Sequence, residues 1–128
     1  MATVANTVTD KRGDTLSRHP VWKAVVGQMG WASGETNEDT STVNVNGVVT
    51  SIVATYSAAD ANITLAIKDL AGNTRYTTTD DDGATYVFAA DGTEYGLNQL
   101  AGDGFIVSVT STDPGAGGVT ADITVYGV

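Results

Sequence analysis

ITLAIKDLAGNTRYTTT, residues Ile63–Thr79, contains two runs of strand-forming residues on either side of a turn. In the first run Ile63, Leu65 and Ile67 alternate with Thr64, Ala66 and Lys68. A period of two places the three apolar residues on one face of a strand. The segment 71–73, Ala-Gly-Asn, then reverses the chain, because glycine and asparagine tolerate the backbone angles of tight turns. The stretch therefore predicts two strands joined by a reversal, with one apolar face.

The same alternation recurs outward from this stretch, at Ile52–Tyr56, Phe105–Val109 and Val119–Val125. The chain has 20 threonines, 16 valines and 5 isoleucines but only 5 leucines, and β-branched side chains suit strands better than helices. Turn signals are closely spaced, with a tight hairpin expected at Asn46-Gly47 and a glycine-rich turn at 113–118. We predict an all-β fold, an antiparallel β-sandwich or jelly-roll-like body of seven or eight strands.

Two stretches near the N-terminus depart from this pattern. Residues 20–31, PVWKAVVGQMGW, fit either a strand or extended arm, or a single helix, because apolar residues lie at helical spacing while Val21–Val26 is rich in β-branched residues. Residues 33–42, SGETNEDTST, contain no apolar residue and are expected to be a mobile loop. We therefore predict that residues 1–42 form a partly ordered, extended N-terminal arm and loop, and residues 43–128 the sandwich body.

The charge of the chain is unevenly distributed. Its 128 residues carry a net charge of −9, which argues against general nucleic-acid binding and against attraction to a bare anionic membrane. The first 23 residues nevertheless have a net charge of +2, and the remainder has −11. The basic residues of this first segment are Lys11, Arg12, Arg18 and Lys23. A basic segment before an acidic body predicts a tail that engages a partner.

The stretch RYTTTDDDGATYVF, Arg75–Phe88, raises the question of a calcium loop. An EF-hand with Gly83 at its sixth position would have Ala89 where a bidentate glutamate is needed, and its flanks favour strands. We predict a hairpin turn between Thr79 and Ala84, and leave open an ion held by Asp80 and Asp82.

No other cluster of residues predicts chemistry. His19 is the only histidine and there is no cysteine, so a catalytic triad or a zinc site lacks its usual groups. We predict no enzyme, no catalytic residue, no cofactor and no metal. Trp22 and Trp31 suit a partner-binding anchor or a sugar-stacking platform, but equally a place in the core.

The C-terminal two-thirds of the chain resembles a known family. NVNGVVTSIVATYS, the Asp-x-x-Gly-Asn turn, GFIVSV and the final DITVYG are similar to the head decoration, or cement, proteins of tailed bacteriophages, over residues 43–128. The resemblance implies no catalytic residues. It implies an N-terminal arm that docks on the major capsid protein, with Lys11, Arg12 and Arg18 pairing with capsid carboxylates and Trp22 as the apolar anchor. It also implies self-association as a trimer on the capsid.

From this resemblance we expect a virion structural protein, made in the host cytoplasm and located on the capsid surface. There it would stabilise the head against internal DNA pressure by bridging capsomers. One alternative is a carbohydrate-binding or adhesion β-sandwich module, which predicts exposed aromatics such as Tyr56, Tyr76, Tyr86 and Tyr95. Another is a tail or fibre component of the virion.

Overall fold

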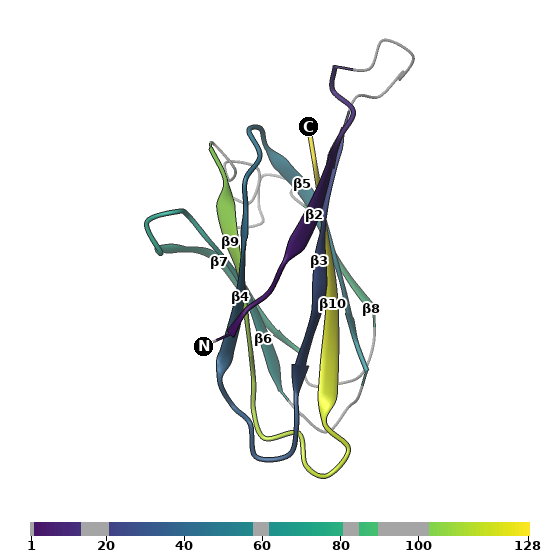
Figure 1. Ribbon diagram of the computed structural model, residues 1–128, viewed down its shortest axis with the longest axis vertical. Helices are drawn as coiled ribbons and strands as arrows, with labels where there is room; N and C mark the ends of the chain where they lie inside the picture. Colours follow the sequence, from purple (N-terminus) through teal and green to yellow (C-terminus); the bar gives the residue numbers. More distant parts are fainter. Residues whose placement is uncertain (1, 14–20, 58–61, 81–84, 90–102) are drawn as a thin grey trace.

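The fold is all-β (Figure 1). The computed structural model describes residues 2–13, 21–57, 62–80, 85–89 and 103–128, which contain ten strands and no helix, so no helix long and apolar enough to span a membrane is present among them. The strands are β1 (Ala2–Thr3), β2 (Asn6–Asp10), β3 (Trp22–Trp31), β4 (Glu38–Val43), β5 (Val49–Tyr56), β6 (Ile63–Lys68), β7 (Thr74–Asp80), β8 (Thr85–Ala89), β9 (Phe105–Ser111) and β10 (Val119–Gly127).

The strands form two sheets that pack face to face, as the sequence predicted for a β-sandwich. Sheet A has the order β1-β4-β9-β6-β7, and sheet B the order β2-β3-β10-β5-β8. Neighbouring strands are antiparallel except at one edge, where β1 runs parallel to β4. Figure 1 shows the two layers side by side, with β3 and β10 along the middle of sheet B.

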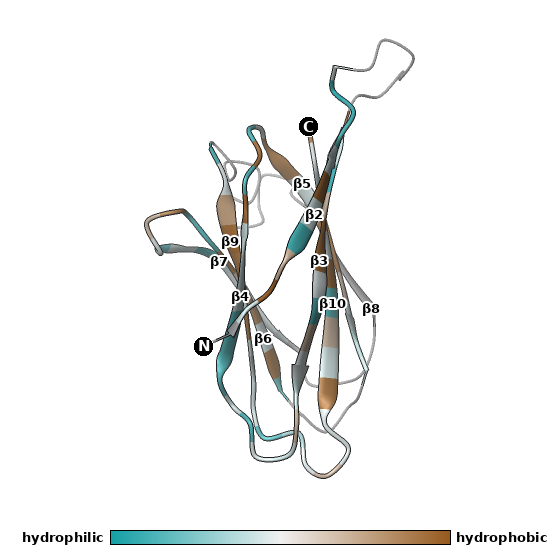
Figure 2. Ribbon diagram, viewed as in Figure 1, coloured by the Kyte–Doolittle hydropathy of each residue, from teal (hydrophilic) through white to brown (hydrophobic). Residues whose placement is uncertain are grey.

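The predicted alternation places the apolar residues in the core between the sheets. Ile63, Leu65 and Ile67 are buried on β6, and the same holds for the inward residues of β5, β9 and β10. Apolar and polar bands alternate along β3 and β10 in Figure 2. Because side chains of a strand point alternately to opposite faces, one set fills the core and the other meets solvent.

Both tryptophans belong to this core. Trp22 is fully buried and its ring lies 6.0 Å from that of Phe105, centroid to centroid. Its indole Nε1 donates to the carbonyl oxygen of Val128 (3.3 Å), and Trp31 Nε1 donates to that of Asn37 (2.7 Å). Of the alternatives left open by the sequence, a place in the core is therefore correct for both residues. The more specific prediction that Trp22 is a surface anchor is contradicted by its burial.

Of the stretch that the sequence left open between strand and helix, Trp22–Trp31 forms β3, an interior strand of sheet B. β3 pairs with β10 from Trp22 to Trp31 and with β2 on its other side. The predicted division between residues 42 and 43 does not appear, because β3 and β4 are integral to the two sheets. The alternating residues Trp22, Ala24 and Val26 face the core, as the period of a strand requires.

The expectation of a mobile loop at 33–42 is wrong for its second half, which forms β4. Asp39 and Ser41 point inward and are buried despite their polarity. Each has a hydrogen-bond partner: Asn37 Nδ2 donates to Asp39 Oδ1 (2.9 Å), and Asn6 Nδ2 donates to Ser41 Oγ (2.8 Å). Buried polar groups are tolerated when their hydrogen bonds are made, so a strand without apolar residues up to Thr42 can still line the core.

Two predicted hairpins are not hairpins. β4 and β5, on either side of Asn46-Gly47, lie in different sheets, and so do β7 and β8 on either side of residues 81–84. Gly47 does adopt a positive φ of 142°, as expected for a glycine in a turn. The strands on either side of this turn, however, do not pair with each other. The reversal at 71–73 does join paired strands, β6 and β7, with Gly72 at φ 91°. Residues 81–84 themselves lie outside the described residues.

The N-terminal strands connect the two sheets at one side of the sandwich, where Figure 1 shows the chain passing from its N-terminus beside β4 to β2 beside β3. Val4 N–H donates to Thr40 O (2.7 Å), and Gly27 N–H donates to Ala5 O (2.8 Å). Asn6 Nδ2 also donates to Thr42 O (2.7 Å). Within the predicted arm, β1 and β2 are thus the edge strands of sheets A and B, and this fixes the positions of Lys11 and Arg12, which follow β2.

Candidate functional site

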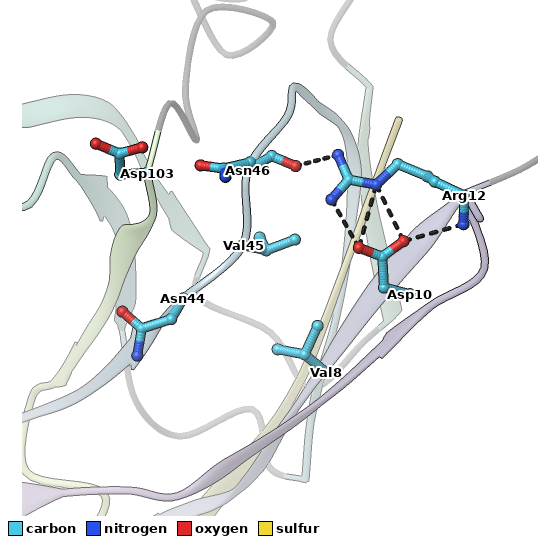
Figure 3. A pocket seen from close by; sticks show the side chains of 7 residues that line it. All are labelled: Val8, Asp10, Arg12, Asn44, Val45, Asn46 and Asp103. Atoms are coloured by element: carbon cyan, nitrogen blue, oxygen red, sulfur yellow. Dashed lines mark hydrogen bonds and ion pairs between the residues drawn. The ribbon is translucent and has the colours of Figure 1, made fainter.

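An open hollow lies where the end of β2 approaches the connection between β4 and β5 (Figure 3). It has a volume of about 530 Å³ and is lined by Val8, Asp10, Arg12, Asn44, Val45, Asn46 and Asp103. Arg12 Nη2 forms an ion pair with Asp10 Oδ2 (2.7 Å), and Arg12 Nη1 donates to the carbonyl oxygen of Asn46. The guanidinium therefore ties the end of β2 to residues 44–48.

The ion pair sets the electrostatics of this hollow. Hydrogen bonds from the side chain and backbone N–H of Arg12 lower the pKa of Asp10 to about 2, and the carboxylate raises the pKa of Arg12 in turn. Both groups are thus charged over the physiological pH range and neutralise each other. Exposed pairs of this kind contribute little to stability, so we interpret the pair as fixing chain geometry.

A second surface lies on the outer face of sheet B. Strand register there aligns Thr9, Lys23, Tyr126 and Ser51 in one row across four strands, and the next row contains Val25 and Thr124. Lys11 follows β2, and its N–H donates to Val21 O (3.0 Å), which continues the pairing beyond Asp10. We call the following set the lysine patch: Thr9, Lys11, Val21, Lys23, Val25 and Tyr126.

The lysine patch combines charge with exposed apolar surface. Val21 and Val25 are 39% and 42% exposed, among the few large apolar side chains of the described residues that face solvent. All members except Val25 surround a shallow hollow of about 160 Å³, into which the half-buried Tyr126 contributes its ring. Interfaces between proteins combine an apolar centre with a polar rim, and the patch has both kinds of surface.

The structure separates the four residues predicted to contact a partner. Lys11 is exposed in the lysine patch, whereas Arg12 lines the other hollow and already pairs with Asp10. Trp22 is in the core. Arg18 lies outside the described residues, as does His19.

Sequence reasoning did not select Lys23, Val25 or Tyr126 as contact residues. The signal was present in VWKAVV, Val21–Val26, where a strand with Trp22, Ala24 and Val26 inward must point Val21, Lys23 and Val25 outward. This signal depends on the segment being a strand, and the sequence alone left a helix as an alternative. The proximity of Tyr126 depends on pairing between strands about 100 residues apart in the chain, which no local pattern reveals.

The described residues hold no group of three or more histidine, cysteine, aspartate or glutamate side chains that could bind a metal ion. The side chain of Asp80, and Asp82, lie outside what the structure describes, so the ion left open there stays a hypothesis. Of the four tyrosines expected on a sugar-binding surface, Tyr56 and Tyr76 are buried. The side chains of Tyr86 and Tyr95 are not among those described.

Comparisons with known proteins identify no family for this chain. No known family matches the sequence, and no curated protein matches it. Solved structures with a similar arrangement of strands include Aeromonas hydrophila PliG, a periplasmic lysozyme inhibitor of g-type lysozyme. It is 11% identical over 97% of this chain and 94% of that chain, with a TM-score of 0.45.

Two further similar structures come from different settings. The CBM36-1 domain of a multidomain xylanase from the hindgut metagenome of Trinervitermes trinervoides is 11% identical over 96% of this chain and 97% of that chain, with a TM-score of 0.46. The VP2 subviral particle of infectious bursal disease virus is 11% identical over 86% of this chain and 32% of that chain, with a TM-score of 0.42.

Proposed function

We propose that this chain is a non-enzymatic virion structural protein that binds the outer surface of a viral capsid and stabilises the head. It does so by bridging capsomers against internal DNA pressure, with the major capsid protein as its partner. The observation that carries the proposal is the lysine patch, a cationic and partly apolar surface on a chain of net charge −9. The resemblance of residues 43–128 to phage head decoration proteins supplies the setting.

The arrangement of the strands supports a rigid bridging role. The patch is built on β2, β3 and β10, and β3 and β10 are the longest strands and lie in the interior of sheet B. A contact surface on paired strands is held in one geometry, so little conformational entropy is lost when a partner binds. A protein that resists expansion of a shell must transmit force without unfolding, and an interior strand pair suits that task.

The test is co-sedimentation of the purified protein with heads assembled by a virus from which the gene for this chain is deleted. We expect saturable binding, at one copy per capsid subunit or three per local three-fold axis, and an increase in the temperature at which the heads break open. Binding in threes would also support self-association as a trimer on the capsid. A folded protein that does not sediment with the heads would contradict the proposal.

In that case the carbohydrate-binding alternative is tested with a glycan array, with and without calcium. Saturable binding to one class of glycan would support that alternative. Sedimentation with tails instead of heads would support the tail or fibre alternative.

A further inference from the structure

Two lysines stand apart from the other cations of the chain. The structure describes five of the six lysines and arginines. Three of them form ion pairs: Arg12 with Asp10 (2.7 Å), Lys68 with Glu38 (3.2 Å) and Arg75 with Asp69 (2.9 Å). Within the described part of the chain, Lys11 and Lys23 have no ion-pair partner. In a protein with 15 acidic residues, two unpaired lysines side by side require an explanation.

Their positions concentrate positive charge at one place. Lys23 pairs in register with Thr9, and Lys11 lies two residues beyond Thr9, just after β2, where its N–H still pairs with Val21, so the two lysines are diagonal neighbours. Diagonal neighbours lie about 7 to 8 Å apart. Their like charges repel each other, and a carboxylate bound near both would remove this cost.

Asp122 is the acidic residue nearest to Tyr126 along β10 on this face of the sheet. It is too far from the two lysines to offset their repulsion. It lies four residues before Tyr126 on β10, about 13 Å along the strand at 3.3 Å per residue. Its oxygens accept a long hydrogen bond from Gln28 Nε2 (3.5 Å). The charge of the lysine patch is therefore not compensated by the described side chains of its own face.

The apolar part of the patch decides the kind of partner. Val21 and Val25 are exposed beside the lysines, and Tyr126 lines the shallow hollow between them. Burying such surface is favourable by about 25 cal/mol per Å². A nucleic acid would use only the charges, and the net charge of −9 opposes its approach. A protein surface with carboxylates around an apolar side chain uses both features.

We propose that the lysine patch binds an acidic protein surface, with Lys11 and Lys23 pairing with two carboxylates and an apolar side chain covering Val21, Val25 and the ring of Tyr126. This inference rests on the proposed function and deepens it, because the acidic surface is then that of the capsid exterior. It moves the contact from the predicted arm to the outer face of sheet B. Arg12, already paired within the chain, takes no part.

The test compares two double variants with equal changes of charge. Lys11→Gln with Lys23→Gln removes two positive charges from the patch. Thr42→Glu with Thr77→Glu adds two negative charges at exposed positions of sheet A, so the net charge of both variants is the same. We expect the first variant to bind heads at least tenfold more weakly than wild type. The second should bind within about twofold of wild type, because only long-range repulsion changes.

Folding is checked for both variants by their thermal unfolding, and Lys11→Arg with Lys23→Arg serves as the conservative change. This arginine variant should bind heads as wild type does, since arginine keeps the positive charge. Binding of the wild type should also weaken as salt rises from about 50 to 500 mM.

The outcomes separate this inference from the proposed function. If wild type binds heads and the glutamine variant binds equally well, the patch inference is overturned while capsid binding stands. If wild type does not bind heads, the proposed function fails, and the patch is tested with a glutamate-rich peptide at low salt by amide chemical shifts. Shifts centred on Lys11, Lys23 and Tyr126 support an acidic partner, and their absence overturns it. Self-association of the free protein that the glutamine variant abolishes would overturn the assignment to a capsid partner.

Discussion

At the scale of single residues, the C-terminal end of β10 packs against the buried tryptophan of β3. A Cβ atom at Gly127 would overlap the ring of Trp22 and the carbonyl oxygen of Val48. Val48 and Val128 also exchange two backbone hydrogen bonds of 2.9 Å. The absence of a side chain at residue 127 thus lets Trp22 lie flat against the backbone.

Gly127→Ala is therefore expected to destabilise the protein by about 3 kcal/mol, the usual range for overpacking a core. Chemical denaturation measures this loss. Gly117→Ala is the matched control, because no atom lies within 4 Å of a Cβ placed there. Equal stability of the two variants would show that Trp22 can move aside.

Asp39 is a carboxyl group that the fold buries. It is only 4% exposed, and burial raises its pKa, with Glu35 contributing in the same direction while the Gly30 N–H and Asn37 oppose them. A carboxyl group with a higher pKa in the folded state binds its proton more tightly there. Its contribution to stability is thus present below the unfolded pKa of about 3.9 and is lost as pH rises through the folded pKa.

Asp39→Asn removes this titration and keeps a side-chain oxygen to accept the hydrogen bonds. We expect the midpoint temperature of the variant, relative to wild type, to be higher at pH 7 than at pH 3. Thermal unfolding at the two pH values measures the difference. A difference of the opposite sign would mean that the carboxylate is better stabilised by its neighbours than its burial suggests.

At the scale of elements, the N-terminal strands stabilise both sheets at once. β2 pairs with β3 over five residues, β1 pairs with β4, and Val4 and Val8 pack against the core. The sequence predicted a partly ordered arm here, separate from the sandwich body. The pairing indicates that the two parts are integral to each other, because removing β2 leaves β3 with an unpaired edge.

Deleting residues 2–10 is therefore expected to lower the free energy of unfolding by about 3 kcal/mol, through lost hydrogen bonds and half-buried valines. Amide exchange in β3 should become faster, and hydrogen exchange measures this strand by strand. Deleting residues 2–3 alone is the control, since it leaves β2 paired with β3. If the amides of β3 exchange as slowly in the longer deletion as in wild type, residues 2–10 are an independent arm and the prediction is wrong.

At the scale of the whole molecule, negative charge opposes compaction. The net charge is −9, and three ion pairs among the described residues compensate only locally. Exposed charges of one sign repel over distances comparable to the Debye length, which is about 10 Å at 0.1 M salt. Screening should then favour the folded state.

We expect the midpoint of thermal unfolding to rise by a few degrees when NaCl increases from about 20 to 200 mM. The variant with glutamine at residues 11 and 23 has a net charge of −11, so its midpoint should rise more. A midpoint that falls with salt would indicate that local ion pairs outweigh the net repulsion.

The sequence by itself determined the fold class and much of the core. Period-two alternation identified β6 and its inward residues Ile63, Leu65 and Ile67, as well as β9 and β10, because which face a side chain occupies is a local property of the strand. The basic N-terminal segment also pointed to Lys11. The sequence could not exclude a helix at 20–31, where the spacing of the apolar residues fits both the period of a helix and that of a strand.

Only the tertiary structure decided which strands are neighbours. Asn46-Gly47 has the chemistry of a hairpin turn, yet it joins strands of different sheets, because pairing depends on all strands that compete for an edge. The polar strand β4 can line the core because Asn6, distant in the chain, satisfies Ser41, while the adjacent Asn37 satisfies Asp39. The lysine patch likewise exists only where β2, β3 and β10 meet, since its residues are brought together by hydrogen bonds between strands that are distant in sequence.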